Sequence, residues 1–540
     1  MTKFQVKDSL TEGELKSGFK NVIMDGLTTQ AIATLTGGVF LVAFALKLGA
    51  SNLTIGILAA IPPLGQLIQI PAIYLVEKYR VRRDICIVST AVSRAFWLLI
   101  ALIPFLVFIK NPLTLLIIGL IINAAFSAIG GCSWNSWMRD LVPVDRMGSF
   151  FGKRMIYASI VGIFFSLAAG IFIDYWKRLH PGNELYAYSY IFFAGFVTGM
   201  LGLYFLSKIP EPRMVIMQEK INFSKLLMQP FKDTNFKNLI IFLGSWNFAV
   251  NLAAPFFTVY MLMRLKLDMS TIIILMLLNQ IISIAFLRLW GKYSDRFSNK
   301  TILSINGPLF IGCIFAWTFT ARPDYYVLTM PLLVAIHILM GISTAGITLS
   351  SGNIGLKLAP KGQATSYLAA SSFVNSLAAG IAPVLGGLFA DFFTYRKLSL
   401  DIHWESPVRI LDIQTLYFQS WDFFFLFAFL IGFYSIHRLA LVKEIGEVEE
   451  KIVINELIFE VRRDMRSFST ASGLRSTIQF PFSILRSTIE NVNVLNNFKS
   501  SLRNFNRRRV IKSTMFKSSF RKRLRSISRR ERAEEINKTL

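Results

Sequence analysis

Three ionisable side chains stand inside long apolar stretches of this sequence, where their chemistry would be the binding of protons, ions or a polar solute. Counted from the start of its apolar run at 1.5 Å per helical residue, Arg94 lies about 14 Å deep, His337 lies equally deep and Asp25 lies about 6 Å deep. A charge in hydrocarbon is costly, so each of these residues indicates a functional site. We take all three as candidate substrate or coupling residues.

Two of these residues have a structural interpretation as well. Arg94 could pair with Asp25, or it could simply hold its helix against the neighbouring helices. His337 could titrate in a proton cycle, or it could be a hydrogen-bonded residue of helix packing. The sequence leaves both alternatives open.

Membrane helices are the elements that must position these residues. Hydrophobic residues make up 53% of the chain and the mean hydropathy is +0.51, which excludes an ordinary soluble protein. About 20 helical residues cross a bilayer core of roughly 30 Å, and helices satisfy their own backbone groups there. Twelve apolar runs are long enough, at 21–46, 53–76, 85–109, 112–137, 155–176, 188–207, 238–263, 270–290, 302–321, 328–352, 364–393 and 421–442. The first run lacks the features of a cleaved signal peptide.

Basic residues set the predicted orientation. With the N-terminus inside, 23 Lys and Arg fall in the inner segments before the tail and 10 fall in the outer ones, which is the expected positive-inside bias. We predict an all-α protein of the plasma (inner) membrane with both termini cytoplasmic. Its segments are a cytoplasmic N-terminus 1–20, a six-helix half 21–207, a cytoplasmic linker 208–237, a second six-helix half 238–442 and a basic cytoplasmic tail 443–540.

The two predicted halves carry matching residues in the same order. Gly170-Ile171-Phe172-Ile173-Asp174 returns as Gly387-Leu388-Phe389-Ala390-Asp391, at an offset of 217 residues. Leu141-Val142-Pro143 returns as Leu358-Ala359-Pro360 at the same offset, and Lys47-Leu48 with Ser51 returns as Lys266-Leu267 with Ser270. Such matches indicate a duplicated unit, and two parallel halves around a midplane site are typical of transporters.

Charged loops follow the second and the eighth apolar runs. The first contains Glu77-Lys78-Tyr79-Arg80-Val81-Arg82-Arg83, and the second contains Gly291-Lys292-Tyr293-Ser294-Asp295-Arg296 and Lys300. Both resemble the cytoplasmic signature of the major facilitator superfamily, G-x-x-x-D-R-x-G-x-R-R. The second loop keeps the leading glycine and the Asp-Arg pair. The first keeps only the charges, with Ile73 and Arg80 where the family has glycine.

The resemblance implies a cytoplasmic gate, because a carboxylate facing cations at a helix end can join neighbouring helices in one state and release them in another. A stretch after the fourth run, from Arg139 to Arg154, also resembles a loop of the family. The candidate gate residues are Glu77, Lys78, Arg82, Arg83, Asp140, Arg146, Gly291, Asp295, Arg296 and Lys300. The alternative is a positive-inside loop with incidental acids.

A glycine-proline motif lies in the eleventh run. Gly380, Pro383, Gly386 and Gly387 are similar to a motif that antiporters of the family carry in helix five. Helix five of this chain lacks the proline, so we do not infer an antiporter. A proline beside small residues permits bending and close helix contact, and we predict a helix bend at these four residues.

The family arrangement also predicts which helices reach a cavity. By resemblance, helices one, four, seven and ten flank it, which favours Asp25 and His337. Further candidates are polar or aromatic residues on the helices expected to reach it: Asn123, Trp134, Asn135, Trp246, Asn247, Asn251, Asn279 and Gln280. An amide beside an indole suits a small amphipathic organic molecule. Interhelical packing is expected to explain roughly half of them, and Trp134 could instead be an interfacial anchor.

Several functions are disfavoured by what the sequence lacks. It has no phosphate-cradling Gly-rich motif, no nucleophile motif and no metal-ligand spacing, so we expect neither an enzyme nor a cofactor or metal. Cys86, Cys132 and Cys313 are far apart and read as small buried hydrophobic residues. We expect a monomeric secondary transporter of a small organic solute, driven by a gradient and coupled to a proton or another ion, as symporter or antiporter.

The tail leaves other functions open. From Lys443 it has 22 basic and 11 acidic residues, and residues 447–468 have the spacing of an amphipathic helix. Such a segment suits an anionic membrane surface, whereas nucleic acid is a weaker alternative and a disordered tail without a partner is a third. A lipid or lipid-linked-molecule flippase is the alternative transport function. A membrane scaffold or receptor acting through the tail is the alternative from another class.

Overall fold

The computed structural model describes residues 10–106, 110–143, 147–214, 228–321, 326–360, 364–405, 410–448, 450–456 and 459. Arg146 of the candidate gate and most of the basic tail, including most of the amphipathic segment 447–468, lie outside these residues. The described chain up to Val453 forms one compact unit.

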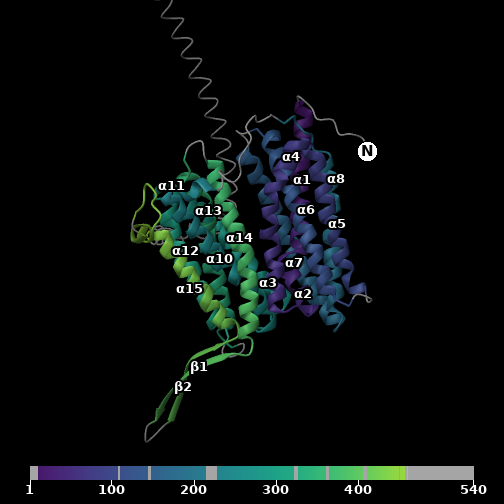
Figure 1. Cartoon of the computed structure of the whole chain (residues 1–540). Helices are drawn as coiled ribbons and strands as arrows, with labels where there is room; N and C mark the ends of the chain where they lie inside the picture. The colour runs from purple at the N-terminus through teal and green to yellow at the C-terminus, as the bar shows by residue number, and fades with distance from the viewer. Residues whose placement is uncertain are drawn as a thin grey trace, which may run out of the picture. The chain divides into compact units, whose positions relative to one another are not determined.

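The first six spans contain ten helical elements, of which Figure 1 labels the α-helices. They are α1 (Glu12–Thr36), α2 (Gly38–Lys47), α3 (Asn52–Gly65), η1 (Gln66–Ile68), α4 (Gln69–Tyr79), α5 (Arg82–Leu102), η2 (Ile103–Phe105), α6 (Pro112–Leu141), α7 (Met147–Leu179) and α8 (Glu184–Ser207). The first span is α1 followed by α2, and the second is α3 followed by η1 and α4. Pro62 and Pro63 lie inside α3, just before its irregular continuation.

The second six spans follow η3 (Gln229–Phe231). They consist of α10 (Thr234–Met263), α11 (Met269–Arg296), α12 (Asn299–Ala316) with η4 (Trp317–Phe319), α13 (Thr329–Leu358), α14 (Ala364–Phe393) and α15 (Trp421–Ala440). Twelve described helices or helix pairs are therefore long and apolar enough to cross a membrane, which confirms the predicted fold class.

Several helix boundaries differ from the sequence prediction, and one pair of strands was not predicted. Helix α1 begins at Glu12, before the apolar run, because Thr11 and Glu14 form a reciprocal capping box. Helix α7 begins at Met147, inside the stretch that we expected to be a loop. An antiparallel hairpin of β1 (Lys397–Glu405) and β2 (Ile410–Gln419) lies between α14 and α15, so the protein is not helical throughout (Figure 1).

Each half packs mainly within itself. In the first half α1 contacts α7 and α8, while α5 contacts α6 and α8. In the second half α10 contacts α14 and α15, and α13 contacts α11 and α12. The main contacts between halves are α3 with α14 and α7 with α11. The second span of each half therefore lies against the fifth span of the other, which is the contact pattern of two duplicated units.

Candidate functional site

The first span is interrupted in its middle by two glycines. Gly37 is extended at φ −111° and ψ −167°, and Gly38 has φ +54°, a left-handed conformation that favours glycine. Helix α1 ends at Thr36 and α2 begins at Gly38. Three cavities, of about 440, 500 and 220 Å³, are all lined by Gly37. Irregular backbone within a membrane span is tolerated where it lines such a cavity.

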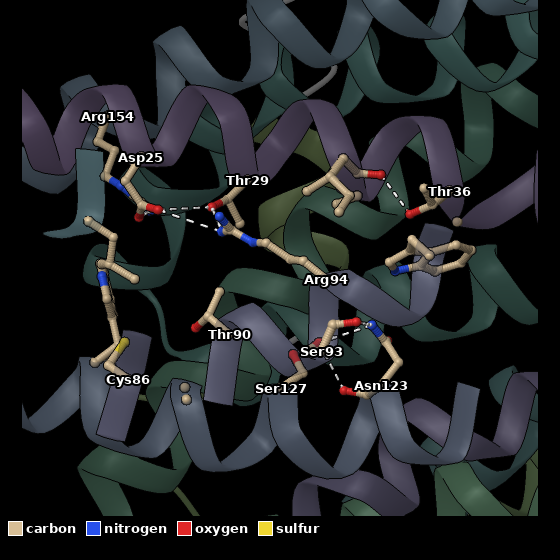
Figure 2. A pocket seen from close by; sticks show the side chains of 18 residues that line it. Asp25, Thr29, Thr36, Cys86, Thr90, Ser93, Arg94, Asn123, Ser127 and Arg154 are labelled. Atoms are coloured by element: carbon tan, nitrogen blue, oxygen red, sulfur yellow. Dashed lines mark hydrogen bonds and ion pairs between the residues drawn. The ribbon is translucent and has the colours of Figure 1, made fainter. Parts of the chain in front are cut away.

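The 440 Å³ cavity is lined by a charged cluster, which we call the Asp25 cluster: the buried Asp25 and Arg94 and the half-buried Arg154. Asp25 on α1 is 3% exposed. Its carboxylate lies 3.6 Å from an Arg94 nitrogen on α5 and 3.7 Å from an Arg154 nitrogen on α7 (Figure 2). The pairing of Arg94 with Asp25, one of its two sequence interpretations, is present. Two cations and one anion give the cluster a formal charge of +1.

Other bonds hold the two guanidinium groups in place. Arg94 donates to the carbonyl of Gly199 at 2.6 Å and to Oγ1 of Thr29 at 2.8 Å. Arg154 donates to the carbonyl of Val22 at 3.2 Å and lies over the Trp134 ring, 5.0 Å from its centroid. Both arginines are therefore positioned independently of Asp25.

Two glycines make room for these arginines. A Cβ added at Gly26 would lie 2.4 Å from Nε of Arg154, and one added at Gly202 would lie 2.5 Å from a terminal nitrogen of Arg94. Any side chain at either position would displace a guanidinium. The glycines of α1 and α8 therefore leave the space that the two guanidinium groups occupy.

Hydroxyl, amide and indole groups complete the charged cavity. Asn123 on α6 donates to the Ser93 carbonyl at 2.8 Å and to its Oγ at 2.9 Å, while Ser93 Oγ donates to the Asn123 carbonyl at 3.0 Å. This exchange fixes α6 to α5 beside the cavity (Figure 2). Nε1 of Trp134 is buried and has no hydrogen-bond partner among the described residues.

The neighbouring 500 Å³ cavity is mainly apolar and lies between the halves. Leu41, Ile55, Leu58 and Leu120 line it from the first half, and Pro255 and Met276 line it from the second. It shares Thr36, Gly37, Trp97, Asn123 and Ser127 with the charged cavity. The two cavities together offer a charged end and an apolar end.

The structure places several candidate residues away from these cavities. Trp246 is buried against Phe310, and Asn247 and Asn251 bond within α10. His337 is buried, with Nδ1 2.7 Å from the Leu333 carbonyl and its ring against Trp317. These are the environments of helix-packing residues.

Three other candidates vary in position. Asn135 is exposed, and Gln280 lines the 220 Å³ cavity. The backbone oxygen of Asn279 would be 2.6 Å from a Cβ added at Gly341, so this part of α11 lies directly against α13.

The candidate gate residues of the first half tie helix ends together. Arg82 is fully buried, and its guanidinium contacts Asp140, the Ser136 carbonyl at 3.0 Å and the Pro212 carbonyl at 2.7 Å. Glu211 accepts the backbone N–H groups of Arg82 at 2.8 Å and Arg83 at 3.3 Å. Burial raises the pKa of Glu211, and these bonds only partly offset it. All of these contacts lie within the first half and the start of the linker that follows it.

An equivalent arrangement closes the second half. Glu444, which follows α15, accepts from Asn299 at 3.0 Å and from the backbone of Lys300 at 2.7 Å, and it lies 2.8 Å from the Lys357 ammonium. Lys300 also pairs with Glu447 at 2.9 Å. Glu211 and Glu444 were not among the predicted gate residues, although each is an acidic residue just after the last span of its half.

The remaining gate residues face outward from the helix ends. Glu77 and Asp295 are exposed, and a Cβ added at Gly291 would be in ordinary contact with Leu349, at 3.7 Å. The Lys78 ammonium lies near the Tyr79 ring and the Arg296 guanidinium lies near the Phe297 ring.

The opposite end of the bundle, outer by the predicted topology, has contacts between the halves. Asp174 at the end of α7 accepts the backbone N–H groups of Met269 at 3.0 Å and Ser270 at 2.8 Å. Asp391 at the end of α14 accepts those of Asn52 at 3.1 Å and Leu53 at 2.9 Å. We call these two carboxylates the outer caps. They are the repeated aspartates of the sequence, and each satisfies the N-terminus of a helix in the other half.

The glycine-proline motif of α14 forms the contact with α3. A Cβ added at Gly387 would lie 2.5 Å from the Asn52 carbonyl oxygen, and one added at Gly380 would lie 2.4 Å from Leu64. The carbonyl oxygen of Pro383 would be 2.1 Å from a Cβ at Gly56, and Gly386 packs on α10. These residues therefore allow close helix contact.

Arg154 and Thr29 are the functional candidates that sequence reasoning missed. We assigned Arg154 to a loop because its neighbours resemble a loop motif, whereas α7 already includes it. Its spacing from the apolar run, one residue before position 155, was the available signal. Among the described residues, no group of three His, Cys, Asp or Glu could hold a metal ion.

Comparisons with known proteins agree with this architecture. The Major Facilitator Superfamily profile matches residues 26–383. YxiO of Bacillus subtilis (strain 168), described as an uncharacterized MFS-type transporter, is 25% identical over 186 residues, or 34% of this chain and 40% of that protein. This chain thus matches less than half of that relative's length.

Solved structures show the same fold at low sequence identity. The nucleoside transporter NupG has a TM-score of 0.58 at 13% identity, covering 80% of this chain and 99% of NupG. A POT family transporter in complex with 5-aminolevulinic acid has a TM-score of 0.54 at 11% identity, with 81% and 97% covered. A bacterial homologue of the lysosomal transporter Spinster, inward-facing and unoccupied, has a TM-score of 0.52 at 13% identity, with 71% and 84% covered.

Proposed function

Since this chain belongs to the Major Facilitator Superfamily and is a multi-pass membrane transporter, we propose that it moves a small organic solute by alternating access, driven by a proton gradient. The two six-helix halves rock about the cavities at Gly37. The N- and C-termini face the cytoplasm, and the membrane is the plasma membrane.

The observation that carries this proposal is the Asp25 cluster. The buried groups of Asp25 and Arg94 and the half-buried guanidinium of Arg154 lie together between membrane helices, in contact with a cavity of about 440 Å³. Buried charges of this kind are expensive in a membrane span and belong to substrate or proton pathways. We assign solute binding to Arg94, Arg154 and Asn123, and proton binding to Asp25.

The contacts at the two ends support an inward-facing state. The outer caps join the halves, whereas Arg82 with Glu211 ties the first half only to the linker, and Glu444 ties the second half only to the start of the tail. Glu77 and Asp295 are exposed at the inner end. In the outward-facing state these two carboxylates would bind the opposite half while the outer caps release.

A lipid or lipid-linked-molecule flippase is a second candidate, favoured by the apolar cavity beside the charged one. A vesicle assay separates the two functions. The flippase predicts that the purified protein moves a fluorescent phospholipid between leaflets, as shown by its reduction with dithionite. The solute transporter predicts no lipid movement above that of protein-free vesicles.

A ligand screen by thermal shift tests the main proposal. The purified protein is screened against small organic solutes at several pH values, with R94Q as the site variant and R139Q, at an exposed position near the end of α6, as the control. We expect a pH-dependent stabilising ligand that R139Q retains and R94Q loses. A ligand whose effect R94Q preserves in full would contradict the assigned site.

A further inference from the structure

We propose that the solute is an amphipathic organic anion, with one small anionic group such as a carboxylate on the Asp25 cluster and an apolar body in the adjoining cavity. This inference rests on the proposed transport function and names its substrate class. It follows from four features of the site: its charge, its unfilled hydrogen bonds, its second cavity and its proton balance.

The charge of the cluster favours an anion. Arg94 and Arg154 face Asp25 from α5 and α7, and the Cys86 thiol lies nearby on α5. These are the ionisable groups that face Asp25 among the described residues. Two guanidinium groups against one carboxylate leave one positive charge uncompensated in a low-dielectric setting, where a cationic solute would be repelled.

The hydrogen bonds of the cluster are incomplete. Both guanidinium groups approach Asp25 at ion-pair distance, 3.6 and 3.7 Å, which is beyond a good N–H···O bond. The hydroxyl of Thr29 donates to the carboxylate at 3.4 Å. Trp134 adds an indole N–H without a described partner beside Arg154. Guanidinium and indole donors around one space match the acceptor oxygens of a second anionic group.

The adjoining cavity indicates that the rest of the solute is apolar. It is lined by Leu41, Leu58, Leu120 and Met276 and meets the charged cavity at Gly37, Trp97 and Asn123. A solute lying across this junction would place its anionic group at the arginines and its apolar part among the leucines. Apolar surface with a few placed polar groups is the usual composition of a small-molecule site.

The number of protons that the cluster binds determines how solute movement is coupled to proton movement. When the anion binds the guanidinium groups, it competes with the Asp25 carboxylate, which takes one proton from solvent. The cluster then holds a neutral Asp25, two cations and one bound anion, so its charge is +1 before and after binding. One proton and one monovalent anion therefore move together, and the transport step is electroneutral.

Charged thiol reagents test the site potential without knowledge of the solute. A cysteine at Ser127, which lines both cavities, is compared with one at Ala254, which lines only the apolar cavity. Both are made in the full chain with Cys86, Cys132 and Cys313 changed to serine. Each cysteine is labelled with the anionic MTSES and with the cationic MTSET. Each labelling rate is divided by the rate of the same reagent with free mercaptoethanol, which corrects for the intrinsic reactivity of the reagent.

The ratio of the MTSES rate to the MTSET rate should be about ten times higher at S127C than at A254C. D25N should raise that ratio further, and R94Q or R154Q should lower it to the A254C value. A ratio at S127C equal to or below that of A254C overturns the anion proposal, as does a ratio unchanged in both arginine variants. If the cysteine-free chain aggregates, the ratios are measured in the native background after subtraction of native-cysteine labelling. If S127C shows no preference for the anionic reagent but the protein still binds a ligand with pH dependence, the solute is not an anion, whereas the transport proposal stands.

Discussion

The carboxylate of Asp391 accepts hydrogen bonds from both the backbone N–H and the side-chain amide of Asn52, at 3.1 and 2.9 Å, across the boundary between the two halves. Asp174 makes the equivalent backbone contacts with Met269 and Ser270 at the other boundary. The duplicated aspartates are therefore reciprocal helix caps. In an alternating-access cycle both caps must break when the outer end opens.

Removing the charge of both caps should favour the outward-open state. In D174N/D391N each cap keeps one acceptor oxygen and loses its charge, and hydrogen bonds to charged groups contribute about 1.5–3 kcal/mol each. A shift of about 1.4 kcal/mol changes a two-state ratio tenfold. Spin labels at Pro181 and Tyr395, both exposed, should report a new longer distance at the outer end.

The control for this variant is D268N at the same end. Asp268 pairs with Lys177 at 3.5 Å, but both side chains are more than half exposed, so this pair contributes little. Its distance distribution should match the wild type. Equal distance distributions in D174N/D391N and wild type would show that the outer caps do not contribute to gating.

Close packing of α14 on α3 should be sensitive to one added carbon. In G387A the new Cβ would lie 2.5 Å from the Asn52 carbonyl oxygen and 2.6 Å from the Leu53 Cα, backbone atoms that cannot rotate away. We expect a lower Tm in detergent and a wider outer end. G312A, whose Cβ would meet no atom within 4 Å, should gain up to about 1 kcal/mol from helix propensity. If both variants melt alike, the α3–α14 contact is not tight.

Much of this architecture could be predicted from sequence. The lengths of the apolar runs predict the twelve spans, and the sequence repeat identifies Asp174 and Asp391. Both signals are local patterns of residues along the chain. The partners of these aspartates could not be predicted, since each lies in the other half of the chain. The hairpin was missed because residues 394–420 read as a loop between spans, although Leu398, Leu400, Ile402 and Trp404 alternate with the period of a strand.

The candidate site shows the same division. Asp25, Arg94, Asn123 and Trp134 were found because polar or aromatic residues in an apolar run stand out, and all four line the charged cavity. Trp246 and His337 were chosen on the same grounds but are packed in the second half. Sequence gives the helix on which a residue lies, whereas the side of the helix that faces a cavity depends on tertiary packing.

The cap of the second half should make stability depend on pH. Burial opposes ionisation of Glu444, but the bonds from Lys357, Lys300 and Asn299 outweigh it, so its pKa lies below the ordinary value of 4.5. A carboxyl group with a lowered pKa stabilises the fold above pH 4.5, and this contribution is lost as the pH falls through the folded-state pKa.

The variant E444Q tests this dependence. It should have a lower Tm than wild type at pH 7, and the difference should shrink as the pH falls below 4.5. E450Q, at an exposed position, should match wild type throughout. A difference between E444Q and wild type that is constant from pH 7 to pH 4 would show that the charge of Glu444 does not contribute.

Transport by D25N in proteoliposomes tests the central claim most directly, with the ligand identified by thermal shift as the solute. If Asp25 carries the proton and Arg94 with Arg154 holds the solute, D25N should exchange solute across the membrane but fail to accumulate it under an inward proton gradient. R94Q should do neither. Proton-driven accumulation by D25N at the wild-type level, or unchanged exchange by R94Q, would contradict the account.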